Sequence, residues 1–272
     1  MHIRVNDITL NVEQSGAGRS LLLLHGFTGC AATWTPLIAA LPPHFRTIAP
    51  DLIGHGRSDS PLDAERYRIE RCVADLLALL DALEIERADV LGYSMGGRVA
   101  LHLVAAAPGR VGALVLESSS PGIVDAAERQ ARIAADQALA DSIARDGLAA
   151  FVERWERLPL FASQASLPED TRAQLHAQRL RNDPLGLANS LRGMGTGRQE
   201  SLWGRLAALD VPMLLIAGEL DAKYCALAHQ MAAALPNGHA VIVPGVGHAV
   251  HLEQPQAFAK NVLEFLRRTS IE

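Results

Sequence analysis

The chain of 272 residues has few cysteines and almost no lysine. Its three cysteines, Cys30, Cys72 and Cys225, are odd in number, far apart and match no metal-ligand spacing. We therefore expect reduced thiols and no metal site built from them. Lys223 and Lys260 are the only lysines among 25 basic residues. Such a bias fits a compositional preference for arginine, so a single arginine is weak evidence of a functional role.

The chain also lacks a long hydrophobic run and a large charge of one sign. No apolar segment approaches the roughly 20 residues of a membrane span, and Met1–Asp7 has none of the apolar character of a signal peptide. A net charge of −5 argues against nucleic acid as the main partner. We expect a cytoplasmic protein that neither inserts into membranes nor binds nucleic acid. Its expected state is a monomer or a weak homodimer.

Apolar residues make up 49% of the chain and are arranged as short strands that alternate with helices. Ile3–Val5 and Ile8–Val12 are typical of a hairpin, and Leu21–Leu24 is typical of a strand buried on both faces. Alternation at this spacing predicts an α/β fold with a mostly parallel central sheet and helices on both faces. Further strands are predicted at 47–49, 88–91, 113–116, 211–217 and 240–243, and helices at 69–83 and 255–267.

The alternation stops in the middle of the chain. From about Pro121 to Arg205 the sequence has charged, alanine-rich helical stretches broken by prolines, and no strand-like run. We interpret residues 121–205 as a helical cap, or lid, inserted into a core of residues 1–120 and 206–272. Such a cap would lie over the carboxyl edge of the sheet, where open α/β sheets place their sites. The alternative is that these helices only cover a side of the sheet.

The most informative motif is Gly92-Tyr93-Ser94-Met95-Gly96, between a predicted strand and a helix-length apolar run. A serine on so tight a turn takes a strained backbone, and the flanking glycines let neighbouring elements approach it closely. Its hydroxyl then lies at a helix N-terminus, which favours nearby negative charge. In this context the motif predicts a nucleophile elbow with Ser94 as the catalytic serine.

A serine is a poor base or nucleophile unless an imidazole assists it and an acid orients that imidazole. Asp221 and His248 each follow a later predicted strand, at the same sheet edge as Ser94. They also occur in the chain order that accompanies this type of turn. We predict that the three residues form a catalytic triad. The alternatives are His251 in place of His248 and Glu117 in place of Asp221.

Two backbone amides are candidates for an oxyanion hole. In this architecture one N–H comes from the loop after the first central strand and the other from the residue after the serine. The loop here is His25-Gly26-Phe27, so the amides of Phe27 and Met95 are predicted to fill this role. We interpret the Gly-rich segment 51–58, at the end of another strand, as structural.

Arg98 lies one helical turn after Ser94, so the two side chains share a helix face. An arginine in an otherwise apolar helix is costly unless its charge meets an anion. That anion is either an internal Asp or Glu or a carboxylate of the substrate, and the sequence alone does not separate the two.

With the elbow, triad and cap in place, the chain resembles the α/β-hydrolase superfamily over its full length. Several segments resemble the 2-succinyl-6-hydroxy-2,4-cyclohexadiene-1-carboxylate (SHCHC) synthases of menaquinone and phylloquinone biosynthesis, although the first of them, His25–Gly29, is shared across the superfamily. The arginine after Gly96-Gly97 is among the narrower signals. The segments are His25-Gly26-Phe27-Thr28-Gly29, residues 92–98, Glu117-Ser118-Ser119-Ser120-Pro121-Gly122, residues 187–197 with their Met-Gly-Thr-Gly, and Trp203.

The resemblance implies a lyase that eliminates pyruvate from 2-succinyl-5-enolpyruvyl-6-hydroxy-3-cyclohexene-1-carboxylate, with neither metal nor cofactor. Ser94, assisted by His248 and Asp221, would remove a ring proton rather than form an acyl-enzyme. The Phe27 and Met95 amides would stabilise the negative charge that develops on a carbonyl oxygen.

The substrate of that family is a tricarboxylate, and guanidinium groups match carboxylates bidentately. Alignment to the family therefore implies substrate-binding roles for Arg98, Arg132, Arg179, Tyr93 and Trp155. Arg132 and Arg179 lie in the predicted cap, and each has an alternative as a solvated helix residue. Arg181 is the nearest competitor of Arg179 for its role.

The main alternative function is a serine carboxylesterase or thioesterase that uses the same triad. It predicts burst kinetics, hydrolysis of activated esters and no dependence on Arg98. A binding module without catalysis is disfavoured, because such a protein is expected to lose a member of the triad.

Overall fold

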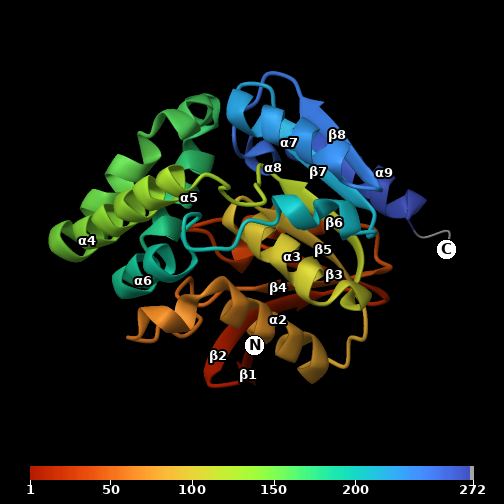
Figure 1. Cartoon of the computed structure of the whole chain (residues 1–272), viewed down its shortest axis with the longest axis horizontal. Coiled ribbons are helices and arrows are strands. Elements are labelled where there is room, and N and C mark those ends of the chain that lie inside the picture. The colour runs from red at the N-terminus through yellow and green to blue at the C-terminus, as the bar shows by residue number, and fades with distance from the viewer. Residues whose placement is uncertain (270–272) are drawn as a thin grey trace.

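A central sheet organises the computed structural model, which describes residues 1–269 (Figure 1). Within those residues eight strands form one sheet in the order β1-β2-β4-β3-β5-β6-β7-β8. The β1–β2 and β2–β4 pairs are antiparallel and all other neighbouring pairs are parallel. The strands are β1 (His2–Val5), β2 (Ile8–Ser15), β3 (Arg19–Leu24), β4 (Phe45–Pro50), β5 (Ala88–Tyr93), β6 (Val111–Glu117), β7 (Met213–Gly218) and β8 (Gly238–Val243).

Helices cover both faces of this sheet, as predicted. Side chains of α2, α3 and α7 pack into an apolar cluster on one face, and those of α1 and α9 pack into a second cluster on the other. Each predicted strand and the two predicted helices are present, and most strands are longer than their apolar runs. The helices of this layer are α1 (Thr35–Ala40), α2 (Ile69–Ala82), α3 (Met95–Ala106), α7 (Ala222–Ala234), α8 (Val250–Glu253) and α9 (Pro255–Arg268).

The run Leu21–Leu24 in β3 shows why an uninterrupted apolar segment forms a central strand. All four side chains are fully buried. Leu22 and Leu24 point into the cluster beneath α2 and α3, whereas Leu21 and Leu23 point into the cluster beneath α1 and α9. Successive side chains of a strand face opposite sides, so a strand with a helix layer on each side needs apolar residues throughout.

A helical region is inserted between β6 and β7. It consists of α4 (Ala126–Glu156), the 3-10 segment η4 (Pro159–Ser166), α5 (Glu169–Arg179) and α6 (Pro184–Met194). In Figure 1 these helices group together at the left of the sheet. They have their own apolar cluster, which includes Phe151. The boundaries 121 and 205, and the role of this region as a separate cap, stay predictions.

The prolines that mark breaks in the inserted region also begin its elements. Pro159 and Pro184 occupy the first turns of η4 and α6, and Pro168 is the N-cap of α5. Proline suits the first turn of a helix because its missing N–H would have no partner there. A further break lies inside α4, where Gly147 has φ 82°, a conformation that glycine adopts without steric cost.

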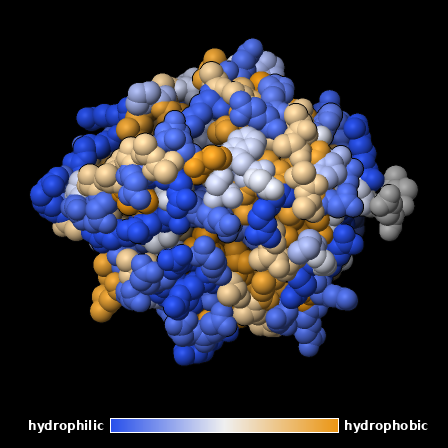
Figure 2. Space-filling view, in the orientation of Figure 1, coloured by the Kyte–Doolittle hydropathy of each residue, from blue (hydrophilic) through white to orange (hydrophobic). Residues whose placement is uncertain are grey.

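The surface mixes polar and apolar side chains. Figure 2 shows hydrophilic residues over much of one face, with hydrophobic residues interspersed among them. Leu62, Val124 and Leu220 are large exposed hydrophobic residues far apart in the chain, whereas Leu158 and Leu160 are exposed close together. Among residues 1–269 there is no helix with both the length and the apolar character to cross a membrane.

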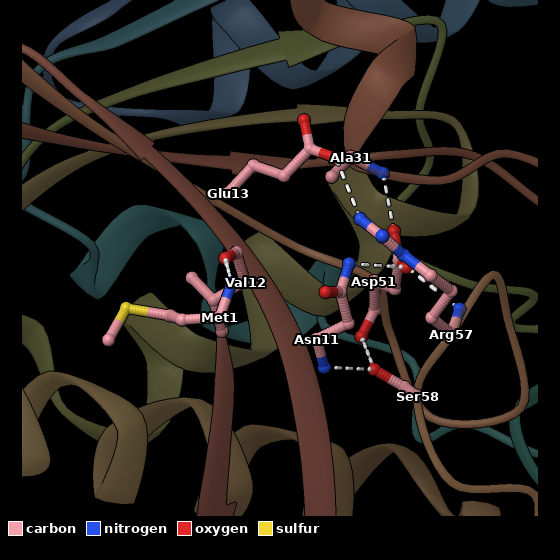
Figure 3. Close-up of polar contacts among 8 residues, drawn as sticks. All are labelled: Met1, Asn11, Val12, Glu13, Ala31, Asp51, Arg57 and Ser58. Atoms are coloured by element: carbon pink, nitrogen blue, oxygen red, sulfur yellow. Dashed lines mark hydrogen bonds and ion pairs between the residues drawn. The ribbon is translucent and has the colours of Figure 1, made fainter.

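A buried carboxylate ties together the loops at the carboxyl end of β4. Asp51 accepts hydrogen bonds from Asn11 Nδ2 (2.9 Å), from the Ala31 N–H (2.6 Å) and from the Arg57 N–H (2.8 Å) (Figure 3). Its main-chain oxygen accepts from Ser58 Oγ at 2.6 Å. These bonds join segment 51–58 to β2 and to the loop after β3, which supports its structural interpretation.

Removal of this carboxylate is expected to destabilise the protein. Asp51→Ala leaves two buried donors and one partly buried donor without an acceptor and should lower the free energy of unfolding by about 3 kcal/mol, measured by denaturant unfolding. Asp59→Ala is the matched control, since Asp59 is exposed and accepts one bond, from the Thr9 N–H. Equal losses for the two variants would contradict the role given to Asp51.

Candidate active site

Ser94 occupies the sharp turn between β5 and α3. Its backbone has φ 49° and ψ −105°, a combination that strains any residue with a Cβ atom. The Ser94 N–H donates to the Glu117 carbonyl at 2.8 Å, which joins the turn to β6. A Cβ atom at Gly96 would clash with the Leu24 carbonyl oxygen. The glycine therefore lets the start of α3 pack against the end of β3.

Ser94, His248 and Asp221 form a continuous hydrogen-bonded chain. Ser94 Oγ lies 3.1 Å from His248 Nε2, and His248 Nδ1 lies 2.7 Å from Asp221 Oδ2. Because a carboxylate only accepts hydrogen bonds, Nδ1 carries a proton and Nε2 is left to accept from the serine hydroxyl. His248 and Asp221 are both buried. The predicted triad residues thus meet with the geometry that lets an imidazole take a proton from a serine.

The two predicted oxyanion amides both belong to residues that line the pocket at Ser94. Met95 is the first residue of α3, so its N–H has no acceptor within the helix. The Phe27 N–H has no hydrogen-bond partner among residues 1–269. Both donors are available to a ligand oxygen.

His25 is a supporting residue that sequence reasoning passed over. Its Nε2 accepts from the Leu52 N–H at 2.9 Å, so its Nδ1 carries the proton and donates to the Gly26 carbonyl at 2.8 Å. Burial lowers the pKa of His25, which favours this neutral form. The ring thereby fixes the loop that carries Phe27 against the loop after β4. In the sequence, the feature that could have identified His25 is its position as a polar residue directly after an apolar strand.

A pocket opens at Ser94 between the sheet edge and the inserted helices. Core and inserted helices both contribute to its wall, and the wall combines aromatic rings with charged groups. Its lining comprises Phe27, Tyr93, Ser94, Met95, Arg98, Arg132, Asp136, Leu139, Trp155, Leu160, Phe161, Ser190, Leu191, Met194, Gly195, Thr196, Tyr224 and His248.

Arg98 lines this pocket without a carboxylate partner. Within residues 1–269 the hydrogen bonds of its guanidinium group run from Nη1, to the Met194 carbonyl (2.7 Å) and to Gln199 Oε1 (2.5 Å). Both acceptors are neutral, and Asp136, which is paired with Arg132, acts on Arg98 only electrostatically, so Arg98 forms no internal ion pair within these residues. Burial lowers the pKa of the guanidinium to about 10, and the group remains a cation at neutral pH.

The other two predicted arginines differ in position. Arg132 lines the same pocket as Ser94, and its Nε contacts both carboxylate oxygens of Asp136, at 2.8 and 2.9 Å. Arg179 lines a neighbouring pocket instead, and its Nη1 is paired with Glu156 at 2.8 Å. The structure thus brings Arg98 and Arg132 to the serine and places Arg179 one pocket away.

The predicted aromatic residues lie between these two pockets. Tyr93 and Trp155 line both, together with Phe27 and Phe161. Trp155 packs edge-on against Phe27 with ring centroids 5.3 Å apart. Its indole nitrogen has no hydrogen-bond partner within residues 1–269.

His251 and Glu117, the alternatives to His248 and Asp221, pair with each other. The His251 N–H donates to Glu117 Oε1 at 3.0 Å, and its Nδ1 lies 2.8 Å from Glu117 Oε2. Glu117 is completely buried. Neither side chain hydrogen-bonds to Ser94 or His248 in the described part of the chain, so the geometry favours His248 and Asp221 at the serine.

Tyr224 is a pocket residue that sequence reasoning missed. It lies in the first turn of α7, three residues after Asp221, and its ring centroid is 4.7 Å from that of His248. The spacing from Asp221 was the only available signal, and it becomes informative only once α7 is known to begin there.

Comparisons with known proteins agree with this geometry. Residues 19–255 match the family described as the alpha/beta hydrolase fold, which defines the class of protein. A relative from Bacillus subtilis (strain 168), named "Putative 2-succinyl-6-hydroxy-2,4-cyclohexadiene-1-carboxylate synthase", is 50% identical over 93% of this chain and 92% of its own length. The SHCHC synthase of Serratia proteamaculans (strain 568) is 34% identical over 94% of this chain and 96% of that protein.

A solved structure extends the likeness to three dimensions. The structure of MenH from S. aureus has a TM-score of 0.91 and 35% identity, and the match covers 96% of this chain and 98% of that chain. The chain belongs to the SHCHC synthase family of the α/β-hydrolase fold.

Proposed function

We propose that this chain is an SHCHC synthase that uses Ser94, His248 and Asp221 to eliminate pyruvate from 2-succinyl-5-enolpyruvyl-6-hydroxy-3-cyclohexene-1-carboxylate. The family is that of a lyase in menaquinone biosynthesis. The observation that carries the assignment is the cation of Arg98, which lies in the same pocket as the serine and within residues 1–269 donates its side-chain hydrogen bonds to neutral acceptors. An esterase with this triad has no need of such a charge, whereas a tricarboxylate substrate does.

In the proposed reaction the serine works as a base. Because His248 Nε2 takes the hydroxyl proton, Ser94 Oγ can remove a ring proton next to a carbonyl group. The electron pair of the broken C–H bond moves through the ring and expels the enolpyruvyl oxygen, so that pyruvate leaves. The Phe27 and Met95 amides stabilise negative charge on the carbonyl oxygen during this step.

The inserted helical region acts as a lid in this proposal. Its residues Arg132, Trp155 and Met194 line the pocket opposite the elbow, so the region excludes water and presents a second guanidinium group to the substrate. We place Arg98 and Arg132 on substrate carboxylates. Arg179, whose Nη1 is held by Glu156, lines the neighbouring pocket. The proposed location is the cytoplasm.

A coupled lactate dehydrogenase assay on the tricarboxylate substrate tests the function. The expected result is stoichiometric release of pyruvate. Turnover of p-nitrophenyl esters without pyruvate release would instead support the carboxylesterase or thioesterase. Mass spectrometry of the protein during turnover separates the two roles of Ser94, since a base leaves the protein mass unchanged and a nucleophile adds a covalent adduct.

A further inference from the structure

We propose that Gln199 is a positioning residue that holds Arg98 toward the substrate through a neutral acceptor, without placing a carboxylate in hydrogen-bond contact with it. The inference rests on the proposed function and adds a residue outside the triad and the arginine set. Gln199 lies in the segment after α6 and is almost completely buried, with 1% of its surface exposed.

The orientation of the Gln199 amide follows from the chemistry of its partner. A guanidinium group has only donors, so the amide oxygen must face Arg98 Nη1. The amide nitrogen then points away and has no hydrogen-bond partner among residues 1–269. A buried amide donor without a partner costs free energy, and a glutamate would remove that donor and add an ion pair. The position therefore holds a neutral acceptor where a charged one would bind the arginine more strongly.

The second acceptor of Arg98 has the same character. Met194 is the last residue of α6, so its carbonyl has no partner within the helix and carries part of the negative end of the helix dipole. Both acceptors bind Nη1, and no hydrogen bond from Arg98 Nε or Nη2 occurs within residues 1–269. These two nitrogens remain free to bind a ligand carboxylate in the pocket beside Ser94.

The neighbouring Arg132 provides an internal comparison. Its Nε is bound by both oxygens of Asp136, so much of its charge is neutralised within the protein. Asp136 also acts electrostatically on Arg98 but shares no hydrogen bond with it, so Arg98 is the less directly paired of the two guanidinium groups. The amide side chain of Gln199 preserves that difference.

The test compares two substitutions at position 199. Gln199→Glu adds a carboxylate that pairs with Arg98, and Gln199→Met removes the hydrogen bond without adding charge. In the pyruvate assay we expect Gln199→Glu to raise KM at least about tenfold with kcat within about threefold, because an interaction common to the ground and transition states is lost. Gln199→Met should raise KM only about threefold.

A matched control isolates the effect of the new charge. Gln14 accepts hydrogen bonds from Arg46 Nε (3.3 Å) and Nη2 (3.0 Å) in the β2–β4 region, outside the pocket. Gln14→Glu therefore creates the same kind of ion pair elsewhere and should leave KM unchanged. Equal KM values for Gln199→Glu and Gln199→Met would overturn the inference.

A second measurement does not depend on the reaction. Citrate, used as a tricarboxylate probe, should raise the Tm of the wild type and of Gln199→Met more than that of Gln199→Glu, because a ligand stabilises the form that binds it. The same citrate response in all three proteins would overturn the role of Gln199 whether or not pyruvate is formed. Absence of pyruvate release from the wild type would count against the proposed function alone.

Discussion

Ser94→Ala is expected to abolish pyruvate release, with kcat reduced at least about 1000-fold. In the proposed mechanism the hydroxyl takes the ring proton, His248 acts through the hydroxyl, and Asp221 acts through His248. Steady-state kinetics with the coupled assay measures the loss. The KM should stay within a few fold, because the arginines and aromatic rings that we propose to bind the substrate are unchanged.

A companion variant tests whether the three residues act as a unit. His248→Ala should cause a loss similar to that of Ser94→Ala, and the double variant should lose little more than either single variant. Additive losses would show that Ser94 and His248 contribute independently and would contradict the proposed proton relay. The Tm of Ser94→Ala should stay within a few degrees of the wild-type value, because alanine keeps the Cβ atom at this turn and the variant loses one hydrogen bond, that to His248.

Arg98→Met is expected to lower kcat/KM by roughly 100- to 1000-fold. This decrease corresponds to the loss of one or two charge-assisted hydrogen bonds to a carboxylate. Methionine keeps much of the volume of the arginine stem. The Tm should change by only a few degrees, because the variant removes a cation that is held by neutral acceptors alone. Kinetics and thermal unfolding of the same preparation provide both values.

Arg46→Met is the matched control for this prediction. Arg46 also donates only to a side-chain amide and a main-chain carbonyl, those of Gln14 and Leu83, and it lies near the start of β4, away from the pocket. Its loss should leave kcat/KM unchanged. Activity close to that of the wild type for Arg98→Met would remove Arg98 from the site.

Much of the fold was predictable because its signals are local. Apolar runs such as Leu21–Leu24 indicate a strand that is buried on both faces, and the glycines around Ser94 indicate that backbone segments approach each other closely. Strand ends were less predictable, because main-chain pairing continues past the last apolar residue. β2 runs on to Ser15, for example, since Glu13–Ser15 pair with the end of β4 opposite Thr47–Ala49.

The site was predictable to the extent that its residues lie at recognisable places in the chain. Ser94, Asp221 and His248 follow strands, so their meeting at one edge could be inferred. Gln199 and Tyr224 could not, because each depends on where an adjacent helix ends or begins. Whether an arginine such as Arg98 meets an internal carboxylate depends on contacts between residues about a hundred positions apart.

The bond between Arg98 and the Met194 carbonyl has a thermodynamic consequence. It connects α3, which begins directly after Ser94, to the last turn of the inserted helix α6. A ligand whose affinity depends on the position of that guanidinium must, by reciprocity, change the equilibrium between docked and displaced arrangements of α6. Substitutions that loosen α6 should then weaken binding of acidic ligands even where they touch no ligand atom.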